Sequence, residues 1–188
     1  VLLKIIESGI VYEFISPFAL RLSNSFRADQ FFELDKEVVV QDLSSQRVGE
    51  FMELVRRGRS DQLLKVWDCC AGSGGKSIMA FDLNPEIDLT VSDIRESILT
   101  NLKKRFKQAG IKKYKSFFAD VVLHTLSPEE DFDVIIADVP CSGSGTWART
   151  PEQLFFFNEN NLAGFTQRQQ QILSHAISCL DSNGLLFY

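Results

Sequence analysis

The sequence predicts an α/β fold in which helices cover both faces of a parallel sheet. Four short apolar runs have the length and β-branched content of buried strands, and each ends in an aspartate. Helical stretches alternate with these runs, which is the order of a Rossmann-like sheet. The runs cover residues 63–68, 89–93, 115–120 and 133–138. Because parallel strands end at one edge of a sheet, we expect the four aspartates to share a ligand crevice.

Composition fits one ordinary globular domain. The chain has 188 residues, of which 45% are hydrophobic and 24% charged, and its 16 phenylalanines can fill a sizeable core. The net charge of −5 argues weakly against a protein that coats nucleic acid nonspecifically. No apolar run approaches the roughly 20 residues of a membrane span. We therefore expect a monomer that does not associate with membranes.

The cysteines show no metal-binding pattern. Cys69 and Cys70 are adjacent and cannot readily bridge each other, and no CxxC or Cys/His spacing suggests zinc. No signal peptide is visible, although the chain begins at Val1 rather than Met, which leaves an upstream segment open. We therefore expect no metal and a reducing, cytoplasmic setting.

Residues 1–37 are the least informative part of the chain. Aromatic side chains are frequent there, so we expect the segment to pack on something. The following residues 37–42 look extended. Ser44 and Ser45 then offer an N-cap for a helix that ends at Gly58.

A glycine-rich turn follows the first strong strand, which ends at Asp68, and three ligand templates compete for it. A phosphate-binding P-loop fails because its first glycine would fall at Cys70. A dinucleotide loop keeps two of its three glycines, with Ser77 at the third position. The looser turn of S-adenosylmethionine enzymes fits, because an acid ends the strand and small residues let the backbone approach a ligand. The turn alone is a weak signal.

Two further acids strengthen the prediction of a nucleotide-like ligand. Asp93 lies about 20 residues beyond the glycines, where a doubly wound fold places a carboxylate for ribose hydroxyls. Asp93 is also placed to cap the helix predicted at residues 95–109, and both roles can coexist. Asp120 ends the next strand, near the place of an adenine, although an aspartate after a strand is most often a turn residue.

The last of the four runs leads into Pro140, Cys141 and a small glycine-rich turn. The carboxylate of Asp138 and the thiol of Cys141 are well positioned there for chemistry on a bound ligand. The alternative is a buried strand followed by an ordinary polar loop with an inert cysteine. These residues by themselves leave both interpretations open.

Seven basic residues fall within thirteen positions of the chain. We favour the solvated face of a surface helix as their explanation, and a contact surface for phosphates is the alternative. The residues are Lys103, Lys104, Arg105, Lys107, Lys112, Lys113 and Lys115.

The C-terminal part is predicted to hold a long helix and a fifth strand. The helix covers residues 166–180, and its apolar stripe includes Ile177. His175 is expected on the surface or flank of this helix. Residues 183–184 then turn the chain into a strand at residues 185–188.

Together these segments resemble the Sun-like (also called Fmu) family of RNA cytosine-5 methyltransferases. The resemblance covers residues 38–188, and the glycine turn combined with the Asp-x-Pro-Cys pattern is its most specific part. The matching segments are residues 40–46, residues 68–77, Asp93 with Asp120, residues 138–146 with Pro151, and residues 167–169. The resemblance implies a Rossmann-like S-adenosylmethionine-dependent methyltransferase sheet whose last strands are missing from this sequence.

The resemblance implies S-adenosylmethionine as the cofactor and RNA as the partner, with rRNA favoured over tRNA. Asp138 would hydrogen-bond the polar edge of the target base, with Lys76 close to it. Ser73 stands where the family often has proline, and a small residue there still lets the backbone approach the ligand. By resemblance, the cofactor-binding residues are Cys70, Ala71, Gly72, Ser73, Gly74, Gly75, Lys76, Asp93, Asp120 and Asp138, and the catalytic residues are Cys141, Asp138 and Lys76.

The family's chemistry uses two cysteines. A thiolate adds at carbon 6 of cytosine so that carbon 5 can attack the methyl group, and a base then removes the proton at carbon 5. By resemblance Cys141 assists release, and the nucleophile belongs to a Thr-Cys-Ser motif that follows a segment like residues 185–188. The sequence stops there. We therefore expect a fragment that binds the cofactor and does not methylate RNA by this mechanism.

The resemblance divides the chain into residues 1–37, interpreted as the remnant of an RNA-binding region, and an incomplete methyltransferase domain at residues 38–188. Two alternatives remain open. One is a DNA cytosine-5 methyltransferase in which Cys141 itself is the nucleophile. The other is a noncatalytic RNA-binding module that keeps a methyltransferase scaffold.

Overall fold

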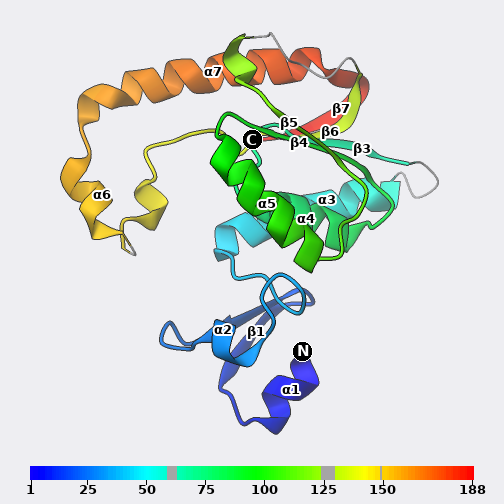
Figure 1. The fold of residues 1–188 in the computed structure, drawn as a ribbon, viewed down its shortest axis with the longest axis vertical. Coiled ribbons are helices and arrows are strands. Elements are labelled where there is room, and N and C mark those ends of the chain that lie inside the picture. The colour runs from blue at the N-terminus through cyan, green and yellow to red at the C-terminus, as the bar shows by residue number, and fades with distance from the viewer. Residues whose placement is uncertain (59–62, 124–129, 149) are drawn as a thin grey trace.

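The computed structural model describes residues 1–58, 63–123, 130–148 and 150–188. Its centre is a five-stranded sheet of order β5-β4-β3-β6-β7, in which every neighbouring pair is parallel (Figure 1). The chain runs outward from β3 to β5 and then returns to place β6 on the other side of β3, so the strand order reverses there. Such a reversal is where ligands bind in open α/β sheets. The strands are β3 (Lys65–Asp68), β4 (Asp88–Asp93), β5 (Lys115–Phe118), β6 (Phe132–Ile136) and β7 (Leu180–Phe187).

Helices cover both faces of this sheet, as the sequence predicts. Three of them lie on one face and α7 lies on the other (Figure 1). The helices are α3 (Leu43–Gly58), α4 (Gly75–Leu83), α5 (Glu96–Gln108) and α7 (Leu162–Ser178). None of the helices within the described ranges is long and apolar enough to cross a membrane.

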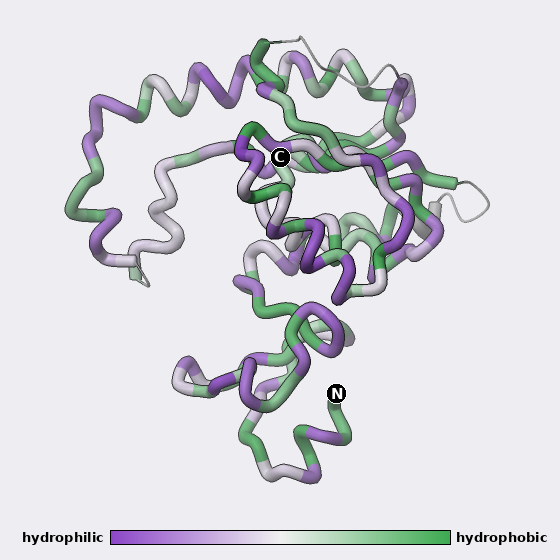
Figure 2. Tube along the Cα trace, in the orientation of Figure 1, coloured by the Kyte–Doolittle hydropathy of each residue, from purple (hydrophilic) through white to green (hydrophobic). Residues whose placement is uncertain are grey.

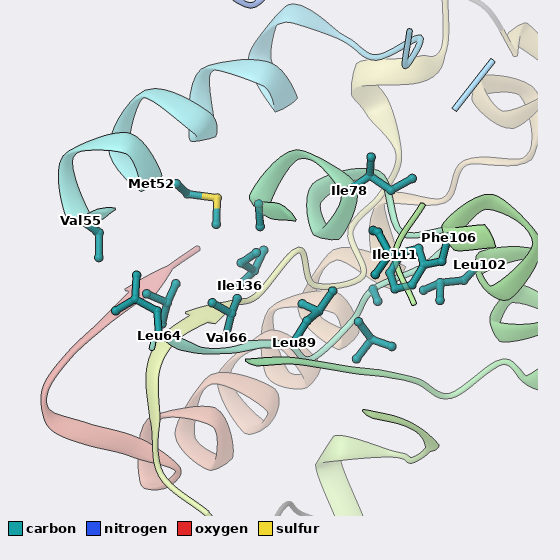
Figure 3. Packing of buried hydrophobic residues seen from close by; sticks show 14 of the residues in the cluster. Met52, Val55, Leu64, Val66, Ile78, Leu89, Leu102, Phe106, Ile111 and Ile136 are labelled. Carbon is teal, nitrogen blue, oxygen red and sulfur yellow. The ribbon is translucent and has the colours of Figure 1, made fainter. Parts of the chain in front are cut away.

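Alternation along the strands builds two apolar cores. Val66 and Val134 face the cluster under α3, α4 and α5, whereas their neighbours Trp67 and Ile135 face the cluster under α7. Figure 3 shows the first cluster, with Met52 of α3 pointing toward the strands. Full burial of one such side chain contributes about 1.5–3 kcal/mol. The two cores therefore hold the three layers together.

The N-terminal unit (residues 1–38) lies beyond α3 and α5, away from the sheet (Figure 1). Hydrophobic and hydrophilic stretches alternate along it (Figure 2). Its aromatic side chains pack on one another, and the ring centroids of Phe31 and Phe32 are 4.9 Å apart. The unit contains α1 (Leu2–Glu7), β1 (Tyr12–Ser16), β2 (Ala19–Leu22) and α2 (Ala28–Phe31), and β1 and β2 form an antiparallel hairpin.

The segment between β6 and α7 projects beyond the sheet (Figure 1). It holds α6 (Pro151–Phe156), which begins with a proline at its first position. Phe155 and Phe156 of this helix are exposed. Short 3-10 turns complete the fold, namely η1 (Val121–Leu123), η2 (Ser144–Thr146) and η3 (Glu159–Asn161).

Two expectations for the start of the methyltransferase region are wrong. Residues 37–42 form no strand, and Val38 makes only an isolated bridge with Leu34. Helix α3 begins at Leu43, so Ser44 and Ser45 lie inside its first turn rather than at its cap. The amide of Gln46 donates to the carbonyl of Asp42, so the first turn of the helix is closed on the residue that precedes Leu43. A preference for caps alone could not place this boundary.

The buried face of α7 differs from the predicted one. The helix begins at Leu162, four residues earlier than expected, and His175 is buried rather than exposed. The imidazole of His175 packs edge-on against Trp67. Ile177, which the apolar stripe predicts to be inside, is 56% exposed. Ile172, His175 and Ala176 share one face by helical spacing, and that face is the one that meets the sheet.

The fifth strand is longer than predicted. It starts at Leu180, where Phe132 of β6 is the partner, and its next partners are Leu185 and Val134. The segment 181–184 therefore bulges between two paired stretches instead of forming a turn that precedes the strand. A Cβ at Gly184 would lie 2.9 Å from the carbonyl oxygen of Phe132, which explains the glycine in the bulge.

Candidate functional site

A cavity of about 340 Å³ opens at the carboxyl edge of the sheet. Residues that follow β3, β4, β5 and β6 line it, together with α7. Five residues predicted from the sequence lie there, namely Cys70, Asp93, Asp120, Asp138 and Cys141. The expectation that the strand-end acids share one crevice is therefore confirmed for three of the four. The fourth, Asp68, is buried with 1% of its surface exposed and does not line the cavity.

The remaining predicted residues lie beside the cavity. Within the described chain, the lining does not include residues 71–76. Hydrogen bonds nevertheless tie their turn to the end of β4, because the amide of Ala71 donates to the carbonyl of Ser92, the residue before Asp93. The amide of Gly72 donates to Asp93 Oδ2 at 2.9 Å.

The glycine turn (residues 69–74) owes one of its glycines to packing. Gly74 has φ +84°, and a Cβ there would lie 2.6 Å from Cε1 of Phe106 on α5. Both the left-handed backbone and the close helix exclude a side chain. The sequence suggested that small residues serve ligand approach, but at Gly74 the approaching group is the next helix.

Asp93 is the most heavily bonded acid of the site. Its Oδ1 accepts from the backbone N–H and Nε of Arg95, each at 2.9 Å. Its Oδ2 accepts from the amide of Gly72 and from Nη2 of Arg95. Burial alone raises the pKa of Asp93, but the hydrogen bonds from Arg95 and Gly72 and the charge of Arg95 outweigh it, so the pKa lies below its usual value. Asp93 is therefore a fixed carboxylate at neutral pH.

The predicted capping role of Asp93 is wrong in detail. Helix α5 starts at Glu96, and its N-cap position is Arg95, whose side chain makes no capping bond. Asp93 lies outside the helix and bonds the amide of Arg95 instead. The carboxylate is thereby kept at the cavity.

Asp120 faces α7 across the cavity. Its Oδ1 accepts from the amide of Val122, which lies within the 3-10 turn η1 after β5. Its Oδ2 lies 3.5 Å from Nη2 of Arg168. Arg168 belongs to the segment 167–169 that the family resemblance singled out, and it lines the cavity. The residue after β5 and a residue of α7 therefore meet at this side of the cavity.

Lys76 lies close to Asp138, as the family resemblance implies, and the two side chains form an ion pair. Lys76 Nζ lies 2.6 Å from Asp138 Oδ2, although the residues are 62 positions apart. The lysine side chain is 15% exposed and the aspartate side chain 59% exposed. The pair joins the first turn of α4 to the loop after β6, with the carboxylate on the solvent side.

Asp68 ends β3 in a fully buried place. The hydroxyl of Ser77 on α4 donates to its Oδ2 at 2.6 Å, and among the described residues no hydrogen-bond partner reaches Oδ1. Burial raises the pKa of Asp68 to about 7, against the opposing hydrogen bond from Ser77. Neighbouring Asp138 and Asp93 push in the same direction as burial, and Lys76 opposes them.

Cys141 presents an exposed thiol at the cavity. Its Sγ accepts a weak bond from the amide of Gly143 at 3.4 Å. The preceding Pro140 is held from α7, because Gln169 Nε2 donates to its carbonyl at 2.9 Å. The thiol is therefore accessible from the cavity and is not part of the buried core.

Two arginines at or beside the site were not predicted from the sequence. Arg95 covers Asp93, and its only sequence signal is its place two residues after the strand-end acid. Arg105 was grouped with a basic surface run, yet its side chain is 18% exposed and turned inward. The lysines at positions 103, 104, 107, 112 and 113 are exposed, as the solvated-face interpretation predicts.

Among the residues that the structure describes, no three His, Cys, Asp or Glu side chains gather in the manner of a metal site.

The solved structures similar to this chain share its fold. The structure of PH0851 matches with a TM-score of 0.80 and 22% identity, covering 98% of this chain and 42% of that one. The structure of NSun6 from Pyrococcus horikoshii with SFG matches with a TM-score of 0.66 and 20% identity, covering 88% of this chain and 40% of that one. The predicted fold class, a Rossmann-like parallel sheet with helices on both faces, is thereby confirmed.

A curated relative also matches over most of the chain. It is the ribosomal RNA small subunit methyltransferase B of Photorhabdus laumondii, which is 29% identical over 182 residues. The match covers 92% of this chain and 39% of the relative, so the chain spans about two fifths of that protein's length. The family described as 16S rRNA methyltransferase RsmB/F matches residues 35–188. Its members depend on S-adenosylmethionine, for which the acids and the glycine turn are suitable ligands. The chain therefore belongs to the 16S rRNA methyltransferase RsmB/F family, as the Sun-like motifs predict.

Proposed function

We propose that this chain is the cofactor-binding part of an enzyme that methylates carbon 5 of a cytosine in ribosomal RNA. One observation carries the proposal. Asp93, Asp120, Asp138 and Cys141 come from three different strand ends and line the same cavity. Family membership supplies the reaction class, and the small-subunit RNA named for the curated relative supports the substrate.

In this proposal each acid of the cofactor site contacts a different part of the cofactor. Asp93 would accept hydrogen bonds from the ribose hydroxyls, as the acid after the second strand does in doubly wound folds. Asp120 would lie beside the adenine, and the glycine turn would lie along the rest of the cofactor. S-adenosylmethionine would supply the methyl group. Residues 70–76 are assigned to its site because Cys70 lines the cavity and the amide of Gly72 bonds the side chain of Asp93 in the lining.

Asp138 and Cys141 face the base. The exposed carboxylate of Asp138 would accept from the amino edge of cytosine, and Lys76 holds it in place from the buried side. Cys141 would act as the base that takes the proton from carbon 5 and so frees the product. The nucleophile that adds to carbon 6 is then a second cysteine rather than Cys141.

Calorimetry tests the cofactor site. The wild-type chain should bind one S-adenosylhomocysteine, and Asp93→Ala should weaken that affinity strongly. Circular dichroism must show that both proteins are folded. A folded wild-type chain that binds no S-adenosylhomocysteine would contradict the cofactor assignment.

Trapping with RNA tests the role of Cys141 in the full-length gene product. If Cys141 is the releasing base, Cys141→Ala accumulates a stable covalent adduct with RNA. If all adduct formation is lost instead, Cys141 is the nucleophile, as in DNA cytosine-5 methyltransferases. Mass spectrometry of small-subunit rRNA after the reaction identifies the methylated base. Absence of a 5-methylcytosine there would overturn the substrate proposal.

A reducing, cytoplasmic location agrees with the cysteines of this protein. All four are free thiols, and Cys69 and Cys179 are buried. Neither buried thiol has a role in the proposed chemistry.

A further inference from the structure

Arg105 of α5 binds two parts of the molecule at once. Its Nε and Nη2 donate to the two carboxylate oxygens of Asp35 at 2.8 Å and 2.6 Å. Its Nη1 donates to the carbonyl and to the hydroxyl oxygen of Ser73, both at 2.9 Å. One planar guanidinium therefore connects the N-terminal unit to the glycine turn.

The geometry of this contact is that of a strong interaction. The Arg105–Asp35 pair is bidentate, and the side chains are 18% and 13% exposed. Solvent screens such a pair much less than the exposed ion pairs elsewhere on this protein. A lysine could supply the charge at position 105 but not the planar fork that reaches four acceptor atoms on two residues.

The N-terminal unit fixes the position of Asp35. Asp35 has φ +64°, a left-handed conformation that non-glycine residues rarely adopt. Its amide donates to the carbonyl of Val38 at 2.8 Å, which closes the turn. Glu37 of the same turn accepts from the amide of Glu33 and pairs with Lys4 of α1. The carboxylate is thus held by the unit and pointed away from it.

Helix α5 fixes the glycine turn from the other side. Arg105 bonds Ser73, and the next residue, Phe106, packs where a Cβ of Gly74 would lie. Gly72 of the same turn bonds Asp93 of the cavity. A displacement of Arg105 therefore reaches the cavity through two residues of one short turn.

We propose that Asp35 and Arg105 are positioning residues for the cofactor site, through which the N-terminal unit sets the conformation of the glycine turn. They touch no atom of the cavity. Without the carboxylate of Asp35, Arg105 loses two of its four hydrogen bonds and no longer holds Ser73 in one place. The inference rests on the proposed function, because it concerns the affinity of the same cofactor site.

The test compares the S-adenosylhomocysteine affinity of Asp35→Asn, Arg105→Lys and Arg21→Gln with that of the wild-type chain. Arg21→Gln is the matched control, because it breaks an exposed ion pair of the same unit, with Glu13 in the β1–β2 hairpin, that takes no part in holding Asp35. Calorimetry should show about 3- to 30-fold weaker binding for the first two variants, the range typical of residues that act at a distance. The control should stay within about twofold of wild type.

Hydrogen exchange separates positioning from plain stability. The amides of residues 70–76 should exchange faster in Asp35→Asn and Arg105→Lys at a temperature where all variants are folded, and those of β3 should not. If both variants keep wild-type affinity and exchange, the inference is wrong. If Asp35→Asn does not fold, Arg105→Lys decides. If the wild-type chain binds no S-adenosylhomocysteine, the proposed function itself is contradicted. If the wild-type chain binds it and both variants bind it equally well, only the inference about Asp35 and Arg105 is contradicted.

Discussion

Lys76 Nζ lies 2.6 Å from Asp138 Oδ2, which joins the start of α4 to the loop that carries Cys141. The lysine is mostly buried and the carboxylate mostly exposed, so the pair aims the acid outward. Because the carboxylate of the pair is open to solvent, the pair contributes little to stability, about 0–1 kcal/mol. The ion pair instead orients the carboxylate of Asp138, which would face the substrate base.

Asp138→Asn should therefore impair methyl transfer far more than cofactor binding. The asparagine side chain has nearly the shape of aspartate but lacks the negative charge and one of the two acceptor oxygens. The amino edge of cytosine would need that acceptor and charge. We expect methyl transfer by the full-length gene product to fall at least about 100-fold, the scale of a lost positioned catalytic group. S-adenosylhomocysteine affinity should change less than about threefold, or about 0.65 kcal/mol. Comparable losses in both measurements would show that Asp138 serves the cofactor only.

Arg95→Gln should strengthen cofactor binding. Arg95 and Gly72 together fill the four acceptor positions of the Asp93 carboxylate, so ribose hydroxyls must compete with the arginine. The side chain of Arg95 is 59% exposed and can leave. We expect S-adenosylhomocysteine to bind about 3- to 10-fold more tightly to this variant, or up to about 1.4 kcal/mol. Weaker binding would mean that Arg95 contacts the cofactor directly. Asp93→Asn is the control that must weaken binding.

Gly74→Ala should be strongly destabilising. The new Cβ meets Phe106 at 2.6 Å and the backbone has φ +84°, so a steric cost adds to the conformational one. We expect a loss of about 2–4 kcal/mol in the free energy of unfolding, measured by urea denaturation. Gly110→Ala is a matched control, because Gly110 has φ +78° and no atom within 4 Å of its Cβ position. That variant should lose only about 1–2 kcal/mol. Equal losses would remove the packing argument for Gly74.

Asp68 should make stability depend on pH. Its pKa is raised to about 7 in the folded protein, above the value of about 3.9 expected when unfolded. The folded state then binds more protons than the unfolded state between these values, so stability falls as the pH rises from about 4 to about 7. At about 1.4 kcal/mol per pKa unit the fall is at most about 4 kcal/mol.

Asp68→Asn isolates this effect, because asparagine cannot ionise. Urea denaturation at pH 5 and pH 7.5 should show a smaller difference for the variant than for wild type. Ser77, whose hydroxyl bonds Asp68, remains in both proteins. An unchanged pH dependence would show that Asp68 is ionised in the fold.

The strand-end acids could be predicted because their cause is local. A short apolar run that ends in an aspartate marks each strand, and the carboxyl ends of parallel strands meet wherever the sheet forms. Asp93, Asp120 and Asp138 therefore lie at one cavity, as expected. The same reasoning misplaced His175, because the buried face of a helix depends on which side meets the sheet.

The sequence by itself determined the family, the order of strands and helices, and the residues at the carboxyl edge of the sheet. These features depend on residues that are close together along the chain, so a local pattern is enough to predict them. Only the tertiary structure decided how Lys76 meets Asp138, that Arg95 covers Asp93, and that Arg105 joins Asp35 to Ser73. Asp35 and Arg105 are 70 positions apart, and no local pattern relates them. Such pairs depend on how the layers pack and on where each long side chain finds its partner after the sheet is formed.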